Sequence, residues 1–122
     1  MAHKVVVLEG DPKLTQSLVG GLQAHFHPVQ LAASDEELRR QVAQHKPEAV
    51  IVDIESWKLA DVASLHRDFP ALPIVCTHRI PDEEIWMAAL NAGASDVCPV
   101  DDVQNVLTSV LRSMALRGVA AA

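Results

Sequence analysis

Five short apolar segments, each followed by a stretch long enough to form a helix, constrain the fold of this sequence more than any other feature. The segments are rich in Val, Ile and Leu, which is typical of strands buried on both faces of a parallel sheet. In the first intervening stretch Leu14, Leu18 and Leu22 recur at helical spacing. The expected strands are residues 4–8, 29–32, 49–53, 72–77 and 95–98, and the expected helices are residues 12–25, 34–45, 58–68, 81–92 and 101–117.

This alternation predicts an α/β fold. Helix-length connections between successive strands imply right-handed parallel crossovers, so helices cover both faces of the sheet. The simplest result is a doubly wound, flavodoxin-like (βα)5 sandwich with a parallel five-stranded sheet in the order 2-1-3-4-5. The 122 residues fit one domain, which we expect to span residues 1–118, with a disordered tail at residues 119–122.

Charge and hydropathy exclude several classes of function. The formal net charge is -6 and no run of basic residues occurs, which disfavours direct binding of nucleic acid. No apolar stretch reaches the roughly 20 residues that cross a bilayer, and the N-terminus lacks the pattern of a signal peptide. We therefore expect a cytoplasmic protein without membrane contact, in which Cys76 and Cys98 are buried apolar groups rather than a disulfide.

Acidic residues follow the first and third expected strands. Glu9 and Asp11 come after the first strand, and Asp53 ends the third. In the predicted strand order these two ends flank the switch point, where open α/β sheets bind their ligands. Clustered carboxylates favour a hard divalent cation such as Mg²⁺. The alternative is that such acids only cap the next helix, and Asp11, which precedes Pro12, fits that role as well.

Four segments resemble response-regulator receiver domains of the chemotaxis-regulator type. Residues 4–12 are similar to the opening of such domains, where the first strand ends in an acidic pair. Residues 47–53 resemble the stretch that leads to the phosphoacceptor aspartate. Residues 71–75 and 88–95 resemble the fourth strand and the turn before the fifth. Together these segments span nearly the whole chain in the correct order.

The resemblance implies a signalling module rather than an enzyme. A histidine kinase or a phosphotransfer protein would donate a phosphoryl group to Asp53, which matches the phosphoacceptor position. Glu9 matches the first residue of the acidic pair. Mg²⁺ would be held by Glu9, Asp11, Asp53 and the backbone carbonyl of Glu55, and would offset the charge that develops on the phosphoryl oxygens.

The sequence also departs from the receiver pattern, which makes this an atypical or degenerate example. Gly10 stands where the family has the second acid, which weakens the expected Mg²⁺ site. Val100 replaces the lysine that contacts the phosphoryl group, and Val97 replaces the aromatic switch residue. The Thr or Ser of the switch falls on His78, although Thr77 lies one position earlier.

Three functions remain open at this stage. In the first, Asp53 is phosphorylated in a degenerate site; in the second, the domain is a pseudo-receiver that acts through phosphorylation-independent protein contact. The third is a small flavodoxin-like enzyme or nucleotide binder. It lacks a phosphate-binding Gly-rich loop, because Gly20 and Gly21 fall inside the first expected helix.

Trp86 and Leu90 are the candidate interface residues. They lie four positions apart on the fourth expected helix, and the resemblance places Trp86 outward. Receiver domains contact effector domains and other partners through helix four, strand five and helix five. We therefore expect a protein partner or a second copy of this chain on that face, the alternative being that Trp86 packs against helix five. Trp57 either shields the acidic pocket or covers helix three.

Overall fold

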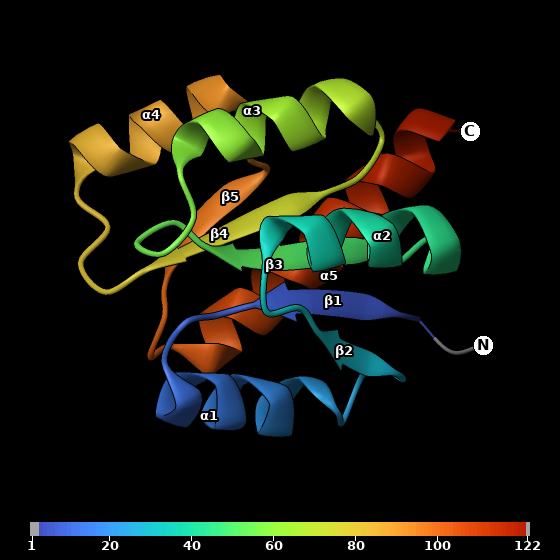
Figure 1. The fold of residues 1–122 in the computed structure, drawn as a ribbon, viewed down its shortest axis with the longest axis horizontal. Coiled ribbons are helices and arrows are strands. Elements are labelled where there is room, and N and C mark those ends of the chain that lie inside the picture. The colour runs from blue at the N-terminus through green and yellow to red at the C-terminus, as the bar shows by residue number, and fades with distance from the viewer. Residues whose placement is uncertain (1–2, 122) are drawn as a thin grey trace.

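A computed structural model describes residues 3–121, with side chains described from His3 to Leu116, and it confirms the alternating α/β architecture (Figure 1). The strands are β1 (Val5–Leu8), β2 (Val29–Leu31), β3 (Ala49–Asp53), β4 (Ile74–His78) and β5 (Asp96–Pro99). The helices are α1 (Pro12–Leu22), α2 (Asp35–His45), α3 (Leu59–Asp68), α4 (Glu83–Ala92) and α5 (Val103–Ala121).

All neighbouring strands pair in parallel, in the predicted order β2-β1-β3-β4-β5. The register aligns the ends of the three central strands, because Leu8 pairs with Val52 and Asp53 pairs with Thr77. The loops that follow β1, β3 and β4 therefore meet at one edge of the sheet. This edge is the switch point that the sequence predicted.

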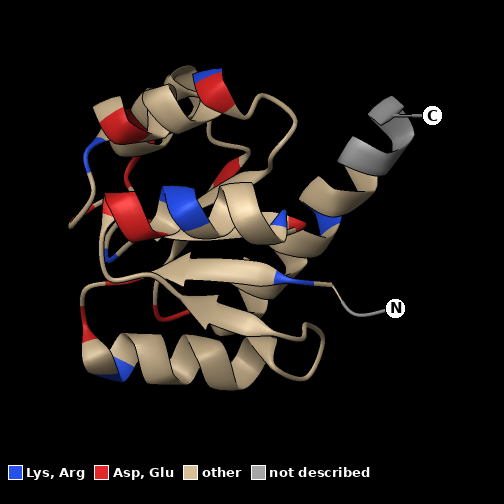
Figure 2. Ribbon diagram, turned by 45° about the vertical axis from the view of Figure 1, so that its right-hand side comes forward, with Lys and Arg blue, Asp and Glu red and all other residues tan. Residues whose placement is uncertain are grey.

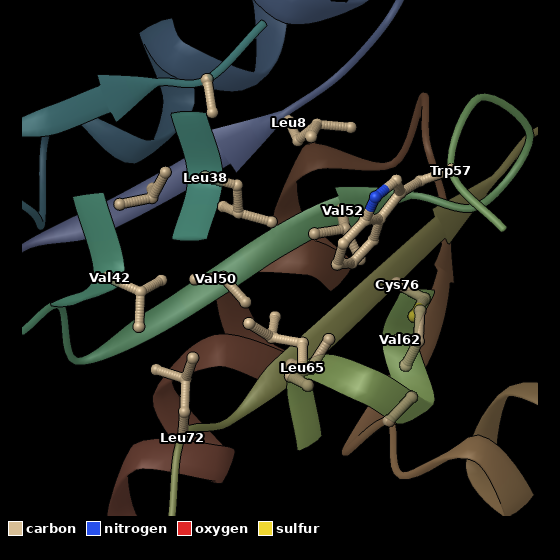
Figure 3. Packing of buried hydrophobic residues seen from close by; sticks show 14 of the residues in the cluster. Leu8, Leu38, Val42, Val50, Val52, Trp57, Val62, Leu65, Leu72 and Cys76 are labelled. Atoms are coloured by element: carbon tan, nitrogen blue, oxygen red, sulfur yellow. The ribbon is translucent and has the colours of Figure 1, made fainter. Parts of the chain in front are cut away.

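Helices cover both faces of the sheet, and each face has its own apolar cluster. One cluster lies under α2, α3 and α4 and includes Val6, Val52, Cys76 and Trp57 (Figure 3). The other lies under α1 and α5 and includes Val7 and the second cysteine, Cys98. Both cysteines are buried and free, as predicted.

The ends of the helices follow local capping rules, with one correction. Gly93 ends α4 with a φ of 112°, and a Cβ there would lie 2.5 Å from the His66 ring, so only glycine suits this close approach of α3 and α4. Ser34 caps α2 by accepting from the Glu37 N–H. Asp101, three residues before Gln104, is the cap that the sequence predicts for α5, and this prediction is wrong, because Asp102 accepts the N–H of Asn105 instead.

Helix α5 runs to Ala121, beyond the end expected at Arg117. The proposed domain limit at residue 118 and the disorder of residues 119–122 stay predictions, and Ala122 lies outside the described residues. Among the described helices, none combines the length and the apolarity that crossing a membrane demands.

Candidate functional site

An acidic pocket of about 400 Å³ lies at the edge where β1, β3 and β4 end. Acidic residues gather at this end of the molecule, where α1, α2 and α4 begin (Figure 2). Four carboxylates line the pocket together with one basic residue, Arg79; the sequence named three of them as carboxylates and the fourth, Glu55, only for its backbone carbonyl. The carboxylates are those of Glu9, Asp11, Asp53 and Glu55.

Asp53 is the last residue of β3 and only 6% of it is exposed. Its Oδ1 accepts a hydrogen bond from the Glu55 N–H at 3.0 Å, and its Oδ2 accepts one from the Ser56 hydroxyl at 2.6 Å. Both bonds come from the turn that follows the strand. They fix the carboxylate at the floor of the pocket, where each oxygen still has a lone pair to offer.

Glu9 lies beside Asp53 and is held by two donors. Its Oε1 accepts the Asp11 N–H at 3.4 Å, and its Oε2 accepts the Thr77 hydroxyl at 3.3 Å. Burial, followed by the negative charge of Asp53, raises the pKa of Glu9 from 4.5 to about 7. A proton therefore resides on Glu9 for much of the time near neutral pH, which reduces the repulsion between the two carboxyl groups.

Asp11 performs the capping role that the sequence left open. Its Oδ1 accepts the N–H groups of Lys13 and Leu14 at 2.8 and 3.3 Å, which caps the first turn of α1. Its other oxygen, Oδ2, faces the pocket and lies 3.5 Å from Arg79 Nη2. Asp11 is thus committed to two partners, the helix and a guanidinium.

Gly10 and Ser56 form a matched pair. A Cβ at Gly10 would lie 2.5 Å from Ser56 Oγ, closer than two such atoms approach. The absence of a side chain at position 10 is therefore what lets the Ser56 hydroxyl reach Asp53. The sequence identified Gly10 as a departure but not Ser56, whose only signal was a hydroxyl three residues after the candidate acceptor.

Arg79 lines the pocket and was missed by the sequence analysis. It follows β4, and its N–H donates to Glu55 Oε1 at 2.5 Å. Its side chain lies 3.5 Å from Asp11 Oδ2 and 3.6 Å from Glu55 Oε2. Val100, where the family has its lysine, lines the same pocket without charge. A basic residue in the loop after β4 was the available signal, because the topology places that loop over the site.

The two switch-position residues have different environments. Thr77 is fully buried, and its hydroxyl donates a hydrogen bond to the Glu9 carboxyl group. His78 ends β4, and its Nδ1 accepts the Ile80 N–H at 3.0 Å. Glu55 Oε1 lies 3.5 Å from the same nitrogen. The role of either residue as a switch stays a prediction.

The binding of Mg²⁺ by Glu9, Asp11 and Asp53, weakened by Gly10, stays a prediction. No group of three or more His, Cys, Asp or Glu side chains close enough to hold a metal ion occurs within the described part of the chain. Gly10 stands where receiver domains have the second acid of the acidic pair, and the Ser56 side chain fills the space beside Gly10. Glu55 contributes its side chain to the pocket, and a metal contact from its carbonyl stays a prediction.

The predicted interface residues lie on a groove between α4 and α5. Trp86 is 40% exposed, as expected for an outward position, and Leu90 is half-buried. Both line a hollow of about 550 Å³ together with residues of α5 that include Arg112 and Leu116. Trp57, in contrast, is buried in the core under α3, so it covers the helix rather than the pocket (Figure 3).

The fold is similar to that of several solved receiver domains. One is the N-terminal signal receiver domain of a two-component response regulator from Bacteroides fragilis, with 20% identity, a TM-score of 0.84 and coverage of 93% of this chain and 98% of that one. A CheY-like receiver domain protein from Methanospirillum hungatei JF-1 has 16% identity, a TM-score of 0.82 and coverage of 98% and 99%.

NtrX from Brucella abortus matches with 21% identity and a TM-score of 0.83; the match covers 99% of this chain but 29% of NtrX. No protein-family model matches the sequence, and no curated protein matches it. The chain therefore has the fold of response-regulator receiver domains.

Proposed function

We propose that this chain is a cytoplasmic receiver domain of a two-component phosphorelay in which Asp53 accepts the phosphoryl group. One observation carries the proposal: Asp53 ends β3 at the switch point, on the floor of an acidic pocket. A carboxylate with both oxygens oriented by hydrogen bonds from its own turn is positioned to act as a nucleophile.

The transfer balances as a displacement at phosphorus. An Asp53 carboxylate oxygen attacks the phosphorus of a phosphohistidine on a histidine kinase or phosphotransfer protein. The new O–P bond forms as the N–P bond breaks, and the electron pair stays on the imidazole nitrogen, which takes up a proton. The product is an acyl phosphate at Asp53. The outcome is a change of state rather than turnover of a metabolite, so the domain is a signalling module and not an enzyme.

The output surface in this proposal is the groove between α4 and α5. Trp86 and Leu90 line it beside Leu116, of which 63% is exposed. An exposed indole next to aliphatic side chains is a typical anchor for a protein partner. The partner is an effector domain, a separate protein or a second copy of this chain. The net charge of -6 argues against direct contact with nucleic acid.

A second function, phosphorylation-independent contact with a protein partner, is favoured by a specific contact. The Ser56 hydroxyl occupies one oxygen of Asp53 at 2.6 Å, in the space that Gly10 leaves free. Val97 is buried in the core and cannot supply the aromatic rotamer change of typical receivers. In this alternative the groove between α4 and α5 binds its partner constitutively.

Incubation with acetyl phosphate followed by intact-mass spectrometry distinguishes the two functions. The expected result is a gain of one phosphoryl group in the unmodified protein and none in Asp53→Asn. Ser56→Ala is a second variant, which frees Asp53 Oδ2 and is expected to retain the reaction. If neither the unmodified protein nor Ser56→Ala gains mass, the result contradicts Asp53 as a phosphoacceptor for acetyl phosphate and favours the phosphorylation-independent function.

A further inference from the structure

The charge balance of the acidic pocket raises a question that the proposed function leaves open. The pocket holds four carboxyl groups, and phosphorylation of Asp53 replaces one of them with a group of about −1.5 to −2 charge. In receiver domains of the usual pattern a lysine faces this charge, but position 100 is Val100, which is buried and neutral. A phosphoryl group here needs a cation from another element.

Arg79 is the one basic residue among the described residues that line the pocket. Its backbone is fixed, because its N–H donates to Glu55 and it follows β4, whose Thr77 pairs with Asp53 in the sheet. Arg79 is two residues after Thr77, the strand neighbour of Asp53, so the Cα of Arg79 is held close to the pocket.

The guanidinium of the same side chain is held only by long contacts. The side chain is 64% exposed, and its ion pairs with Asp11 and Glu55 are 3.5 and 3.6 Å long. Exposed pairs of this kind contribute little free energy, so they can be exchanged for a stronger partner. A planar guanidinium binds phosphoryl oxygens with two parallel hydrogen bonds, which neither Asp11 nor Glu55 receives at these distances.

We propose that Arg79 binds the phosphoryl group at position 53, in place of the lysine that is absent at position 100. At rest the guanidinium pairs with Asp11 and Glu55, and it leaves them when the phosphoryl group forms. This inference rests on the proposed function, because it assigns the cation of that same site. It also accounts for the presence of one basic residue in a pocket that is lined by four carboxylates.

A stable analogue at position 53 tests Arg79 without requiring that the protein accept phosphate. In Asp53→Cys the thiolate displaces trifluoromethanesulfonate from a phosphonomethyl ester, forming an S–C bond to a phosphonomethyl group. Cys76 and Cys98 are fully buried in the core, and burial raises the pKa of Cys76 to about 12, whereas residue 53 lines the pocket, so the new thiol is the more accessible one. Intact mass verifies a single modification.

The readout is the Nε–H resonance of each arginine in ¹⁵N-labelled protein, before and after modification. We expect the Arg79 resonance to move and its exchange with water to slow, because the phosphonate becomes its hydrogen-bond acceptor. Arg67 is the matched control, since it is 75% exposed and lies on α3 beside Asp68. An Arg79 resonance that changes no more than that of Arg67 overturns the proposal.

Unfolding in urea gives a second measurement. Modification should lower the urea midpoint more in an Asp53→Cys/Arg79→Gln protein than in Asp53→Cys/Arg67→Gln, and adding Val100→Lys should reduce the difference. Equal losses in the two proteins also overturn the role of Arg79. The acetyl phosphate experiment is separate: if it fails while the Arg79 resonance moves, Asp53 is not a phosphoacceptor but Arg79 still binds a phosphoryl-like anion.

Discussion

The apolar core and the acidic pocket adjoin each other on β1 and β3, yet their residues are specified in different ways. Val52 is fully buried by the pattern of its strand, whereas Asp53, the next residue, is oriented by the turn that follows. In the core, any residue of suitable size and apolarity satisfies the position. In the pocket, the position of the Ser56 hydroxyl requires that residue 10 carry no side chain. The core therefore depends on size and apolarity, while the chemistry of the pocket depends on matched pairs.

The largest effect is expected in the core. Leu65 is fully buried under α3, so Leu65→Ala should lower the free energy of unfolding by about 2–5 kcal/mol. Leu116→Ala is the matched control, because Leu116 is 63% exposed, and it should change stability by less than about 0.5 kcal/mol. Urea unfolding measures both. Similar losses in the two variants would contradict the boundary between core and surface.

The core and the fold were predictable from the sequence because they depend on periodicity. The Val-rich segments and the helical spacing of leucines fixed the element order, and topology rules then fixed the sheet order. Errors were confined to element ends. The expected cap at Asp101 failed because Asp102, one residue later, has the same side chain and competes for the same role. Periodicity does not distinguish such neighbours.

The site was predictable only in part. The carboxylates of Glu9, Asp11 and Asp53 were found because strand ends and strand order bring them together. Ser56 and Arg79 were missed because their roles depend on contacts between loops. No sequence period records that the loop after β4 reaches Glu55, or that Ser56 fills the space beside Gly10.

A smaller loss of stability is expected for Gly10→Asp, which restores the acid that receiver domains have at this position. Gly10→Asp places a Cβ 2.5 Å from Ser56 Oγ, so it should cost about 1–3 kcal/mol of stability through crowding. Ser56→Ala removes the clashing oxygen, and the double variant should recover most of the loss. If Gly10→Asp were as stable as the unmodified protein in urea, Gly10 and Ser56 would not be a matched pair.

The same double variant also tests whether the pocket can bind Mg²⁺ more tightly. Gly10→Asp/Ser56→Ala frees one carboxylate oxygen of Asp53 and adds a second carboxylate at position 10. Carboxylate oxygens are the protein ligands that Mg²⁺ prefers. We expect its Mg²⁺ affinity to exceed that of the unmodified protein, measured by Trp57 fluorescence in a Trp86→Phe background. Ser56→Ala alone is the control. Equal affinities in all three proteins would show that the missing acid does not limit metal binding.

Glu9 should make stability depend on pH. Its pKa is about 7 in the folded protein and 4.5 as its ordinary value, so between these values the folded state binds more protons than the unfolded state. The stability that Glu9 contributes is complete below about pH 4.5 and is lost as the pH rises through 7. Glu9→Gln should therefore gain stability relative to the unmodified protein between pH 5 and pH 8.

Urea unfolding at those two pH values measures the effect, and the exposed Glu84→Gln is the control. The change should be modest, because Glu9 is half-buried and solvent screens part of its interaction with Asp53. A Glu9→Gln protein whose stability relative to the unmodified chain is the same at both pH values would place the Glu9 carboxyl in water rather than in the pocket.

The last comparison concerns Trp86, which is exposed at the surface groove rather than buried in the core. Its side chain is 40% exposed on the groove between α4 and α5, so Trp86→Ala should lower the free energy of unfolding by about 1–2 kcal/mol, less than Leu65→Ala. Its effect on association should be large, because an exposed indole is a typical anchor of an interface. Urea unfolding measures the stability, and sedimentation velocity over a range of concentrations measures self-association. Met87→Ala is the exposed control for both measurements. A loss of stability comparable to that of Leu65→Ala would make Trp86 part of the core, and the groove would then be a consequence of packing rather than a surface for a partner.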